Sequence, residues 1–260
     1  MRILLPPSET KTVGGRGRAL AGLLQGPLGE HRAVLLDALA TLVRGDPVRA
    51  ADALLLPAGV AAEALAANSA VGSSRTTAAL RRYTGVVYDG LDTAGLPPHV
   101  RRAAGRCVLI FSGLWGVVRG DEAVPNYRVP AKAVLPGVGV VGTFWRPVLE
   151  GTLPTMLGRG IVVDLRSSDY TAMWRPGRDI CGRVVSVRVL SPLPRGGFGI
   201  ISYNSKFAKG RLAAALLTRS AAGEPVARSD DVARAWLGCG GAAAEATGAN
   251  HVDLYTDRAP

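Results

Sequence analysis

Cysteine and histidine are scarce in this sequence. Its 260 residues include three of each, and Cys107, Cys181 and Cys239 lie far apart with no CxxC spacing. A structural zinc site needs closely spaced Cys or His ligands, and a disulfide framework needs a denser set of cysteines. We therefore predict no metal site, no disulfide framework and no cofactor. A thiol-based sensor that uses one of these cysteines remains an alternative.

Long apolar runs and repeats are missing as well. No stretch of about 18 apolar residues occurs, so neither a transmembrane helix nor a membrane partner is predicted. Pro6 and Pro7 end the first apolar run after Leu5, which leaves it too short for the core of a signal peptide. We therefore expect a cytoplasmic protein. The lack of a fixed-period repeat excludes a solenoid.

Positive charge is in excess. Lys and Arg total 31 against 20 for Asp and Glu, which gives a formal net charge of +11. Such an excess favours polyanionic partners such as DNA, because binding releases condensed counterions from the nucleic acid. Arginine greatly outnumbers lysine, and Ala and Gly are abundant, which suggests GC-rich coding. A generically basic protein is therefore an equally good interpretation, and the oligomeric state is not predicted.

Apolar patterning predicts strands and helices that alternate along the chain. Strands are expected over 1–5, from 107, over 160–165, over 183–191 and before a helix that starts near Ser205. Helices are expected over 16–25, 31–44, 60–68, 97–105 and 143–157, and after Ser73 or Ser74. The segment 85–91 is expected to be a short strand or an extended turn. Since 48% of the residues are hydrophobic, the chain can bury a sizeable core.

These elements predict a mixed α/β (α+β) fold, with a mixed sheet and surrounding helices. No linker divides the chain cleanly, so we expect one compact domain over residues 1–222. The Gly/Ala-rich segment 223–260 is expected to be a loosely packed tail.

The first candidate site is the loop after the N-terminal strand, "PPSETKTVGG". Its glycines follow Lys11 and Thr12, whereas a Walker A loop places them before the lysine, and no G-x-G-x-x-G follows a strand. What remains is a point charge on Lys11, hydroxyl donors, and glycines that allow close backbone approach. The loop is predicted equally well to bind an anion or to be a rigid proline turn with a solvated polar face.

The second candidate is the segment "FSGLWGVVRGDEAVPNYRV". Glycines allow a ligand to approach the backbone, aromatic rings offer stacking faces and arginine offers a phosphate fork. The residues concerned are Ser112, Gly113, Trp115, Gly116, Arg119, Tyr127 and Arg128. Trp115 is expected more readily to fill a core, whereas a surface role is favoured for Tyr127 and Arg128.

The third candidate is "VVDLRSSDYTAMW". It places Asp164, Asp169 and Tyr170 at or just after the end of a strand, where α/β proteins often build ligand sites. A carboxylate beside a tyrosine could orient a lysine or act as a general base. Capping of the following helix by Ser167, Ser168 or Asp169 is slightly favoured as the alternative.

The fourth candidate is the start of the helix in "SYNSKFAKGRLAAALLTR". Lys206, Lys209 and Arg211 lie in its first turns, where cations oppose the helix dipole. A basic helix start is favourable when an anion binds there. Three solvated charges beside an apolar face are the alternative. The histidines lack motif context, so no Ser/His/Asp or Cys/His catalytic set is predicted.

In this order, the segments resemble the YaaA (DUF328/UPF0246) family of peroxide stress proteins. The matching pieces are "ILLPPSETKT", "YTGVVYDGLD", "SGLWGVVR" followed by "YR", "TFW", "VVDLRSSDY" and "IISYNSKFAKGRLAAALL". They run from residue 1 to about 217, and their number and order make the match fairly specific. The chain differs in carrying two extra residues before Lys11, Gly120 where proline is expected, and a different C-terminal ending.

The resemblance implies an unusual mixed α/β fold with a positively charged cleft. It also implies protection against hydrogen peroxide by limiting free iron, and DNA binding through a helix-hairpin-helix-like element. Carried over residue by residue, the family motifs imply that the cleft is lined by Lys11, Thr12, Tyr88, Ser112, Gly113, Trp115, Gly116, Arg119, Tyr127, Arg128, Asp164, Asp169, Tyr170, Lys206, Lys209 and Gly210.

Two hypotheses follow. The leading one is a peroxide-stress protein that binds DNA or another polyanion through Lys11, Thr12, Ser112, Gly113, Trp115, Arg119, Tyr127, Arg128, Lys206, Lys209 and Arg211. The alternative is an enzyme acting on a small anionic substrate, such as a nucleotide or an acyl or phosphoryl compound. Its candidate catalytic residues are Lys11, Asp164, Asp169, Tyr170 and Lys206.

Overall fold

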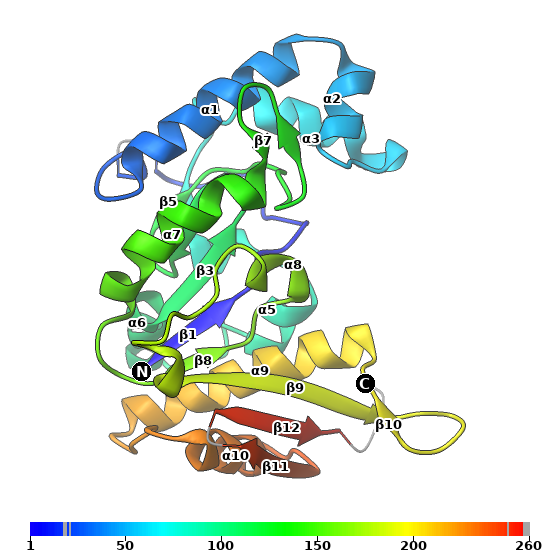
Figure 1. The fold of residues 1–260 in the computed structure, drawn as a ribbon. Helices are drawn as coiled ribbons and strands as arrows, with labels where there is room; N and C mark the ends of the chain where they lie inside the picture. Colours follow the sequence, from blue (N-terminus) through cyan, green and yellow to red (C-terminus); the bar gives the residue numbers. More distant parts are fainter. Residues whose placement is uncertain (18–19, 21, 249, 257–260) are drawn as a thin grey trace.

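The computed structural model describes residues 1–17, 20, 22–248 and 250–256. Its centre is a sheet in the order β11-β12-β9-β8-β1-β3-β4, and β10 pairs with β9 outside that path (Figure 1). The strands are β1 (Arg2–Leu5), β3 (Val108–Ser112), β4 (Gly116–Arg119), β8 (Val162–Asp164), β9 (Val184–Pro192), β10 (Phe198–Gly199), β11 (Ala243–Gly248) and β12 (His251–Tyr255). Strands β3, β1, β8, β9 and β12 are parallel, while β4, β10 and β11 pair antiparallel. The predicted mixed sheet is therefore confirmed.

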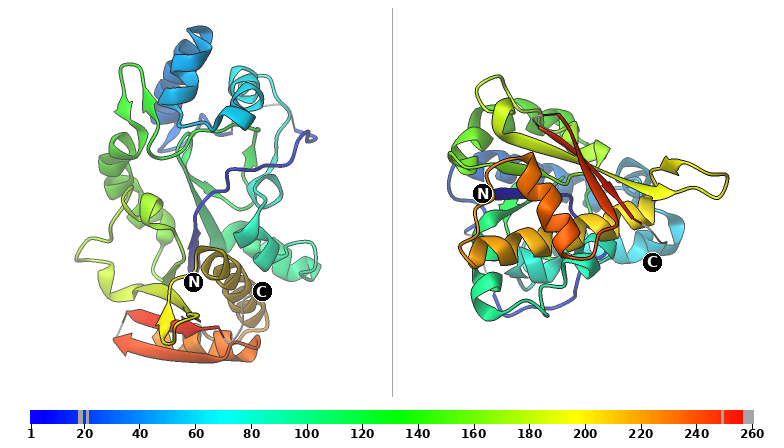
Figure 2. Two further views of the ribbon diagram at one scale, coloured as in Figure 1. Left: turned by 90° about the vertical axis from the view of Figure 1, so that its right-hand side faces the viewer. Right: turned by 90° about the horizontal axis from the view of Figure 1, so that it is seen from below.

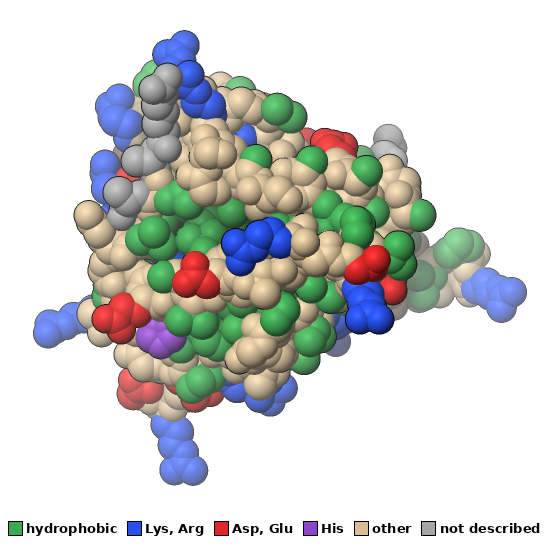
Figure 3. All heavy atoms as spheres, turned by 90° about the horizontal axis from the view of Figure 1, so that it is seen from above, with side chains coloured by type: hydrophobic (Ala, Val, Ile, Leu, Met, Phe, Trp, Pro, Cys, Tyr) green, Lys and Arg blue, Asp and Glu red, His purple; other side chains and the backbone are tan. Residues whose placement is uncertain are grey.

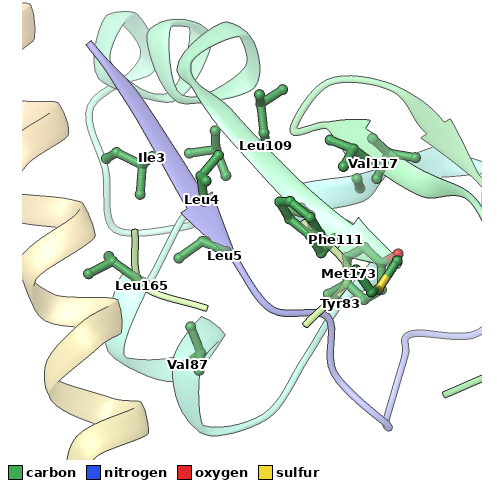
Figure 4. Close-up of a cluster of buried hydrophobic side chains, with 14 of the residues drawn as sticks. Ile3, Leu4, Leu5, Tyr83, Val87, Leu109, Phe111, Val117, Leu165 and Met173 are labelled. Atoms are coloured by element: carbon green, nitrogen blue, oxygen red, sulfur yellow. The ribbon is translucent and has the colours of Figure 1, made fainter. Parts of the chain in front are cut away.

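Strand β1 lies in the middle of this sheet. Ile3 pairs with Val108 on one side and with Val163 on the other, and Ile3, Leu4 and Leu5 are fully buried. A parallel strand covered on both faces reads as a continuous apolar run rather than an alternating one. This explains the sequence "ILL" and places β1 within the main hydrophobic core (Figure 4).

Helices and two small two-stranded sheets surround the central sheet. The helices are α1 (Gly29–Arg44), α2 (Pro47–Ala53), α3 (Ala58–Ser69), α4 (Ala79–Arg82), α5 (Val86–Leu91), α6 (Pro98–Cys107), α7 (Val141–Leu157), α8 (Ser168–Thr171), α9 (Ser202–Ala221), α10 (Ser229–Gly238) and the 3-10 helix η1 (Cys181–Arg183). The small sheets pair β2 (Thr77–Ala78) with β5 (Ala123–Val124) and β6 (Val134–Leu135) with β7 (Gly139–Val140). Helices α1 to α3 lie at the end of the molecule opposite β11 and β12 (Figure 1).

Helices α5 and α9 touch through their backbones. A Cβ atom added at Gly210 would lie 2.0 Å from the Val87 carbonyl oxygen, and one added at Gly90 would lie 2.2 Å from the Phe207 carbonyl oxygen. Glycine at both positions is therefore what allows this approach. The contact fixes the start of α9 beside α5.

Several local predictions differ from the structure. Residues 86–91 form helix α5 rather than a strand, because Val87 and Leu91, four residues apart, both turn into the core. Helix α7 begins at Val141, two residues earlier than predicted, and contains Pro147 and Pro154, and α9 begins at Ser202, earlier than predicted. The predicted helix over 16–25 includes residues 18, 19 and 21, which lie outside the described residues, and none of its described residues is helical.

The C-terminal segment differs from the loosely packed tail that its composition predicted. It contains α10, β11 and β12, and β12 extends the central sheet by pairing with β9 (Figures 1 and 2). Trp236, Val252 and Leu254 are at most 1% exposed. The small residues of the segment hid two ordinary signals, which are the apolar face of α10 and the alternation of "HVDLY". The sheet therefore runs across the boundary predicted at residue 222.

No single helix in the described part of the chain is long and apolar enough to cross a membrane. The pair α2 and α3 reaches that length only across a bend of 97°.

Candidate functional site

A cleft of about 960 Å³ opens where β1 and β8 end. The segments Pro6–Lys11 and Leu165–Tyr170, which directly follow these two strands, form part of its wall. Further walls come from residues 84–88, residues 127–132 and the first turns of α9. The carboxyl edge of parallel strands is the usual place for a ligand site in α/β folds.

Lys11 projects into this cleft from the loop after β1. Its backbone forms an antiparallel bridge with Tyr83, and its Nζ donates a hydrogen bond of 2.8 Å to the Ser8 carbonyl oxygen. The same Nζ lies 4.5 Å from the ring centre of Tyr127 and 5.3 Å from that of Tyr83. The amine is therefore fixed against two aromatic faces.

The charge on Lys11 is poorly compensated. Burial, together with repulsion from Arg128 and Arg82 that outweighs the attraction of Glu9, lowers the pKa of Lys11 to about 7. Glu9 forms an ion pair of 2.6 Å with Arg128 instead. Near neutral pH, Lys11 is consequently divided between its charged and neutral forms.

A chain of buried hydroxyl groups stands behind Lys11. The Tyr127 hydroxyl lies 2.6 Å from the Tyr83 hydroxyl and 2.6 Å from Ser112 Oγ, which also accepts a hydrogen bond of 2.9 Å from the Trp115 amide. Burial raises the pKa of both phenols well above the ordinary range. These hydroxyls are therefore neutral, and they hold the Tyr127 ring in position under the lysine.

The wall after β8 is held by a buried arginine. Arg166 donates to both carboxylate oxygens of Asp164, at 2.9 and 2.6 Å, and its guanidinium lies over the ring of Phe111 at 4.4 Å. Lys209 Nζ donates to the Arg166 carbonyl oxygen at 3.0 Å, and burial lowers the pKa of Lys209. Asp164 thus supports the wall through Arg166 and does not line the cleft itself.

Two further charged groups lie at the mouth of the cleft. Lys132 and Asp169 form an ion pair of 2.7 Å in which both side chains are largely exposed, and such pairs contribute little to stability. Tyr170, next to Asp169, also lines the cleft, and burial raises its pKa. An anionic ligand could compete with Asp169 for Lys132 at little cost.

The basic start of α9 divides between two faces. Lys206 and Lys209 are one turn apart and line the cleft. Arg211 turns away, because its guanidinium donates to the Cys239 carbonyl oxygen and lies 5.7 Å from the ring of Trp236. The predicted cluster of three cations is therefore two cleft lysines and one arginine that holds α10.

The cleft contains all four lysines of the chain, Lys11, Lys132, Lys206 and Lys209. Among the arginines in the described part of the chain, only Arg128, Arg166 and Arg188 line it, although arginine is by far the more common cation. Since the lining makes up about an eighth of the chain, the cleft is strongly enriched in lysine.

The structure brings part of the predicted site together. The predicted residues that line the cleft are Lys11, Tyr88, Tyr127, Arg128, Asp169, Tyr170, Lys206 and Lys209; those outside the lining are Thr12, Ser112, Gly113, Trp115, Gly116, Arg119, Asp164, Gly210 and Arg211. Arg119, for example, is exposed on β4 and pairs with Asp121 at 2.9 Å. Sequence reasoning missed Lys132 and Arg166; the scarcity of lysine was the available signal for Lys132.

A serine, a histidine and an aspartate meet outside the cleft lining, which the sequence did not predict. Ser186 Oγ lies 2.8 Å from His251 Nδ1, and His251 Nε2 lies 3.0 Å from Asp253 Oδ1. Asp253 also accepts two hydrogen bonds from Arg188, so its charge is already neutralised. The pairing of β9 with β12 creates this cluster, and it ties the C-terminal strand to the sheet.

In the part of the chain that the structure describes, no group of three or more His, Cys, Asp or Glu side chains is placed to hold a metal ion. The three cysteines are free; Cys181 is exposed, while Cys107 and Cys239 are half-buried.

Comparison with known proteins identifies the family. The family model described as peroxide stress protein YaaA matches residues 1–227. A UPF0246 protein of Streptomyces coelicolor is 40% identical over 226 residues, which cover 86% of this chain and 85% of that protein. A UPF0246 protein of Corynebacterium efficiens is 34% identical over 252 residues, covering 90% and 92% respectively. As its motifs indicated, the chain belongs to the YaaA (UPF0246) family of peroxide stress proteins.

Proposed function

We propose that the chain acts in the peroxide stress response by binding a small anionic ligand, such as a nucleotide or another phosphorylated compound, in the lysine-lined cleft. The observation that carries this proposal is that every lysine of an arginine-rich chain lines one cleft. By resemblance to the family, we extend the proposal to a role in limiting iron-driven damage.

The charges around the cleft support an anionic ligand. Among the described residues, Lys11, Lys206 and Lys209 form no ion pair with a carboxylate. Arg128 and Arg82 repel the charged form of Lys11, and a bound phosphate or carboxylate would relieve that repulsion. Pockets of this volume are typical of small-molecule sites.

Nucleic-acid binding is the second candidate, because the net charge of +11 favours any polyanion. On the face of the molecule seen from above, however, Lys and Arg side chains are dispersed, several of them near the rim, and hydrophobic side chains occupy much of the middle (Figure 3). A broad basic surface is thus not what this face offers. The small-anion and nucleic-acid proposals differ in which charged side chains should affect binding.

A pair of matched variants separates them. Lys206→Gln removes an exposed charge from the cleft, whereas Arg102→Gln removes an exposed charge from α6, outside the cleft lining. For a small anion, measured by calorimetry with a panel of nucleotides and pyrophosphate, we expect Lys206→Gln to weaken binding about tenfold or more, since hydrogen bonds to charged groups contribute about 1.5–3 kcal/mol. Arg102→Gln should bind as the wild type does.

DNA binding should respond differently. Measured by fluorescence anisotropy with a labelled duplex, sequence-independent binding should weaken steeply with salt and should weaken similarly in both variants. If the protein binds a duplex but none of the small anions, and if Lys206→Gln and Arg102→Gln lose equal affinity for the duplex, the small-anion proposal is overturned in favour of the polyanion.

A further inference from the structure

The use of lysine in the cleft points to chemistry beyond charge. Arginine binds phosphate and carboxylate at least as well as lysine does, but its guanidinium is always charged and is not a nucleophile. A chain with 27 arginines and four lysines has therefore placed in one cleft the side chain that can lose its proton and react. This deepens the proposed function and rests on it.

Lys11 differs from the other three lysines in its surroundings. Lys132 is paired with Asp169, and Lys206 is exposed to solvent. Lys209 donates to the Arg166 carbonyl oxygen, and the nearby Asp164 carboxylate favours its charged form by raising its pKa against the effect of burial. Lys11 is half-buried against the rings of Tyr83 and Tyr127, and the carboxylate nearest to it in sequence is engaged elsewhere. Within the described residues, its Nζ makes a single hydrogen bond, to the Ser8 carbonyl oxygen.

This geometry suits a neutral amine. Once deprotonated, Nζ can keep its hydrogen bond to Ser8 through one N–H and still offer its lone pair to the cleft. The lowered pKa agrees with that state. At pH 7 a lysine with a pKa near 7 has roughly 1,000-fold more neutral amine than an ordinary lysine.

We propose that Lys11 is a nucleophile that forms an imine with the carbonyl group of an anionic aldehyde or ketone, while Lys206, Lys209 and Lys132 hold the anionic group. Nζ attacks the carbonyl carbon and the carbonyl oxygen is protonated, which gives a carbinolamine. The carbon–oxygen bond then breaks and the oxygen leaves as water with both amine protons, leaving a C=N bond. No oxidant or reductant is needed for this step.

Pyridoxal 5′-phosphate, which carries an aldehyde and a phosphate, is a suitable probe. The full chain is incubated with it at pH 7, the imine is followed by its absorbance, trapped with borohydride and located by peptide mass spectrometry. We expect one label per chain on Lys11, competition by pyrophosphate, and loss of at least nine-tenths of the label in Lys11→Arg, which keeps the charge but cannot form the imine. Arg102→Gln should label as the wild type does.

Label spread over several lysines, or concentrated on Lys206, would overturn the assignment of Lys11. Because peptide mapping of the wild-type chain identifies the labelled lysine, this test holds even if Lys11→Arg fails to fold. Pyrophosphate binding measured by calorimetry separates the two proposals. If pyrophosphate binds and Lys11 is not labelled, the imine proposal fails and the anion site stands; if pyrophosphate and nucleotides do not bind, the proposed function itself fails.

Discussion

The backbone contact between α5 and α9 predicts that two glycine-to-alanine substitutions will change the stability of the protein in opposite directions. Gly210→Ala adds a methyl group 2.0 Å from the Val87 carbonyl oxygen and 2.7 Å from the Leu91 amide nitrogen. Since both neighbours are backbone atoms of α5, the helices must separate by about 1 Å to restore ordinary van der Waals contact. Overpacking of this kind costs about 1–3 kcal/mol, and the rigidity of both helices places it at the upper end.

The gain in helix propensity partly offsets this cost. Alanine in a helix is about 1 kcal/mol more favourable than glycine, so we expect Gly210→Ala to lose about 2 kcal/mol. The matched control is Gly151→Ala in α7, where an added Cβ meets no atom within 4 Å. Only the propensity term acts there, so this variant should gain about 1 kcal/mol.

Thermal and urea unfolding of the two variants measure the difference. In a chain of this size, 1 kcal/mol shifts the melting temperature by about 2–4 °C. Gly210→Ala should therefore melt about 4–8 °C below the wild type and should bind pyrophosphate more weakly, because both α5 and α9 contribute residues to the lining of the cleft. Equal stability of the two variants would refute the backbone contact as the reason for glycine at position 210.

Three further predictions concern charged groups. If the cleft binds anions only when Lys11 is protonated, a pKa of about 7 makes affinity for pyrophosphate about tenfold weaker at pH 8 than at pH 6. In calorimetry, Lys11→Arg should make the affinity less dependent on pH, and a steeper fall of affinity with pH in this variant would contradict the prediction. Arg82, fully buried, donates to four backbone carbonyl oxygens, including those of Thr12 and Gly14, so Arg82→Met should lower the free energy of unfolding by about 3 kcal/mol or more in urea; a loss below about 1 kcal/mol would show that water replaces it. The hydrogen bond from Arg188 lowers the pKa of Asp253, so its stabilisation is complete above about pH 4 and is lost as pH falls through the folded-state pKa; Asp253→Asn should lose less stability than the wild type on acidification, and parallel acid profiles would refute the pairing.

The sequence predicted the parts of the fold that depend on local apolar patterning. Strands β1 and β8 were found because buried parallel strands are continuous apolar runs. Helix α5 was missed because β-branched Val86 and Val87 favour strands locally, whereas packing on α9 decides the outcome. Strand β12 was missed because its partner, β9, lies about 65 residues earlier in the chain, and pairing over that separation leaves no local signal.

The candidate site was predictable only in part. Its cations follow from residue type, but their directions follow from packing, as the turn of Arg211 toward Trp236 shows. Helical spacing alone predicts that residues 209 and 211 lie on different faces of the helix, because they are about 200° apart around its axis. The ion pair that removes Glu9 from Lys11 joins residues 9 and 128 and could not be seen without coordinates.

The central place of β1 has a consequence for the order in which the protein folds. Residues 2–5 pair with residues 108–110 and 162–164, so β1 lacks one neighbour until more than a third of the chain has been synthesised and lacks the other until well over half has been synthesised. Contacts this distant in sequence slow folding, and an apolar strand that waits for its partners is open to aggregation. Pro6 and Pro7 stand directly after this strand and cannot donate sheet hydrogen bonds. They limit how far the waiting strand can extend into a wrong pairing during synthesis.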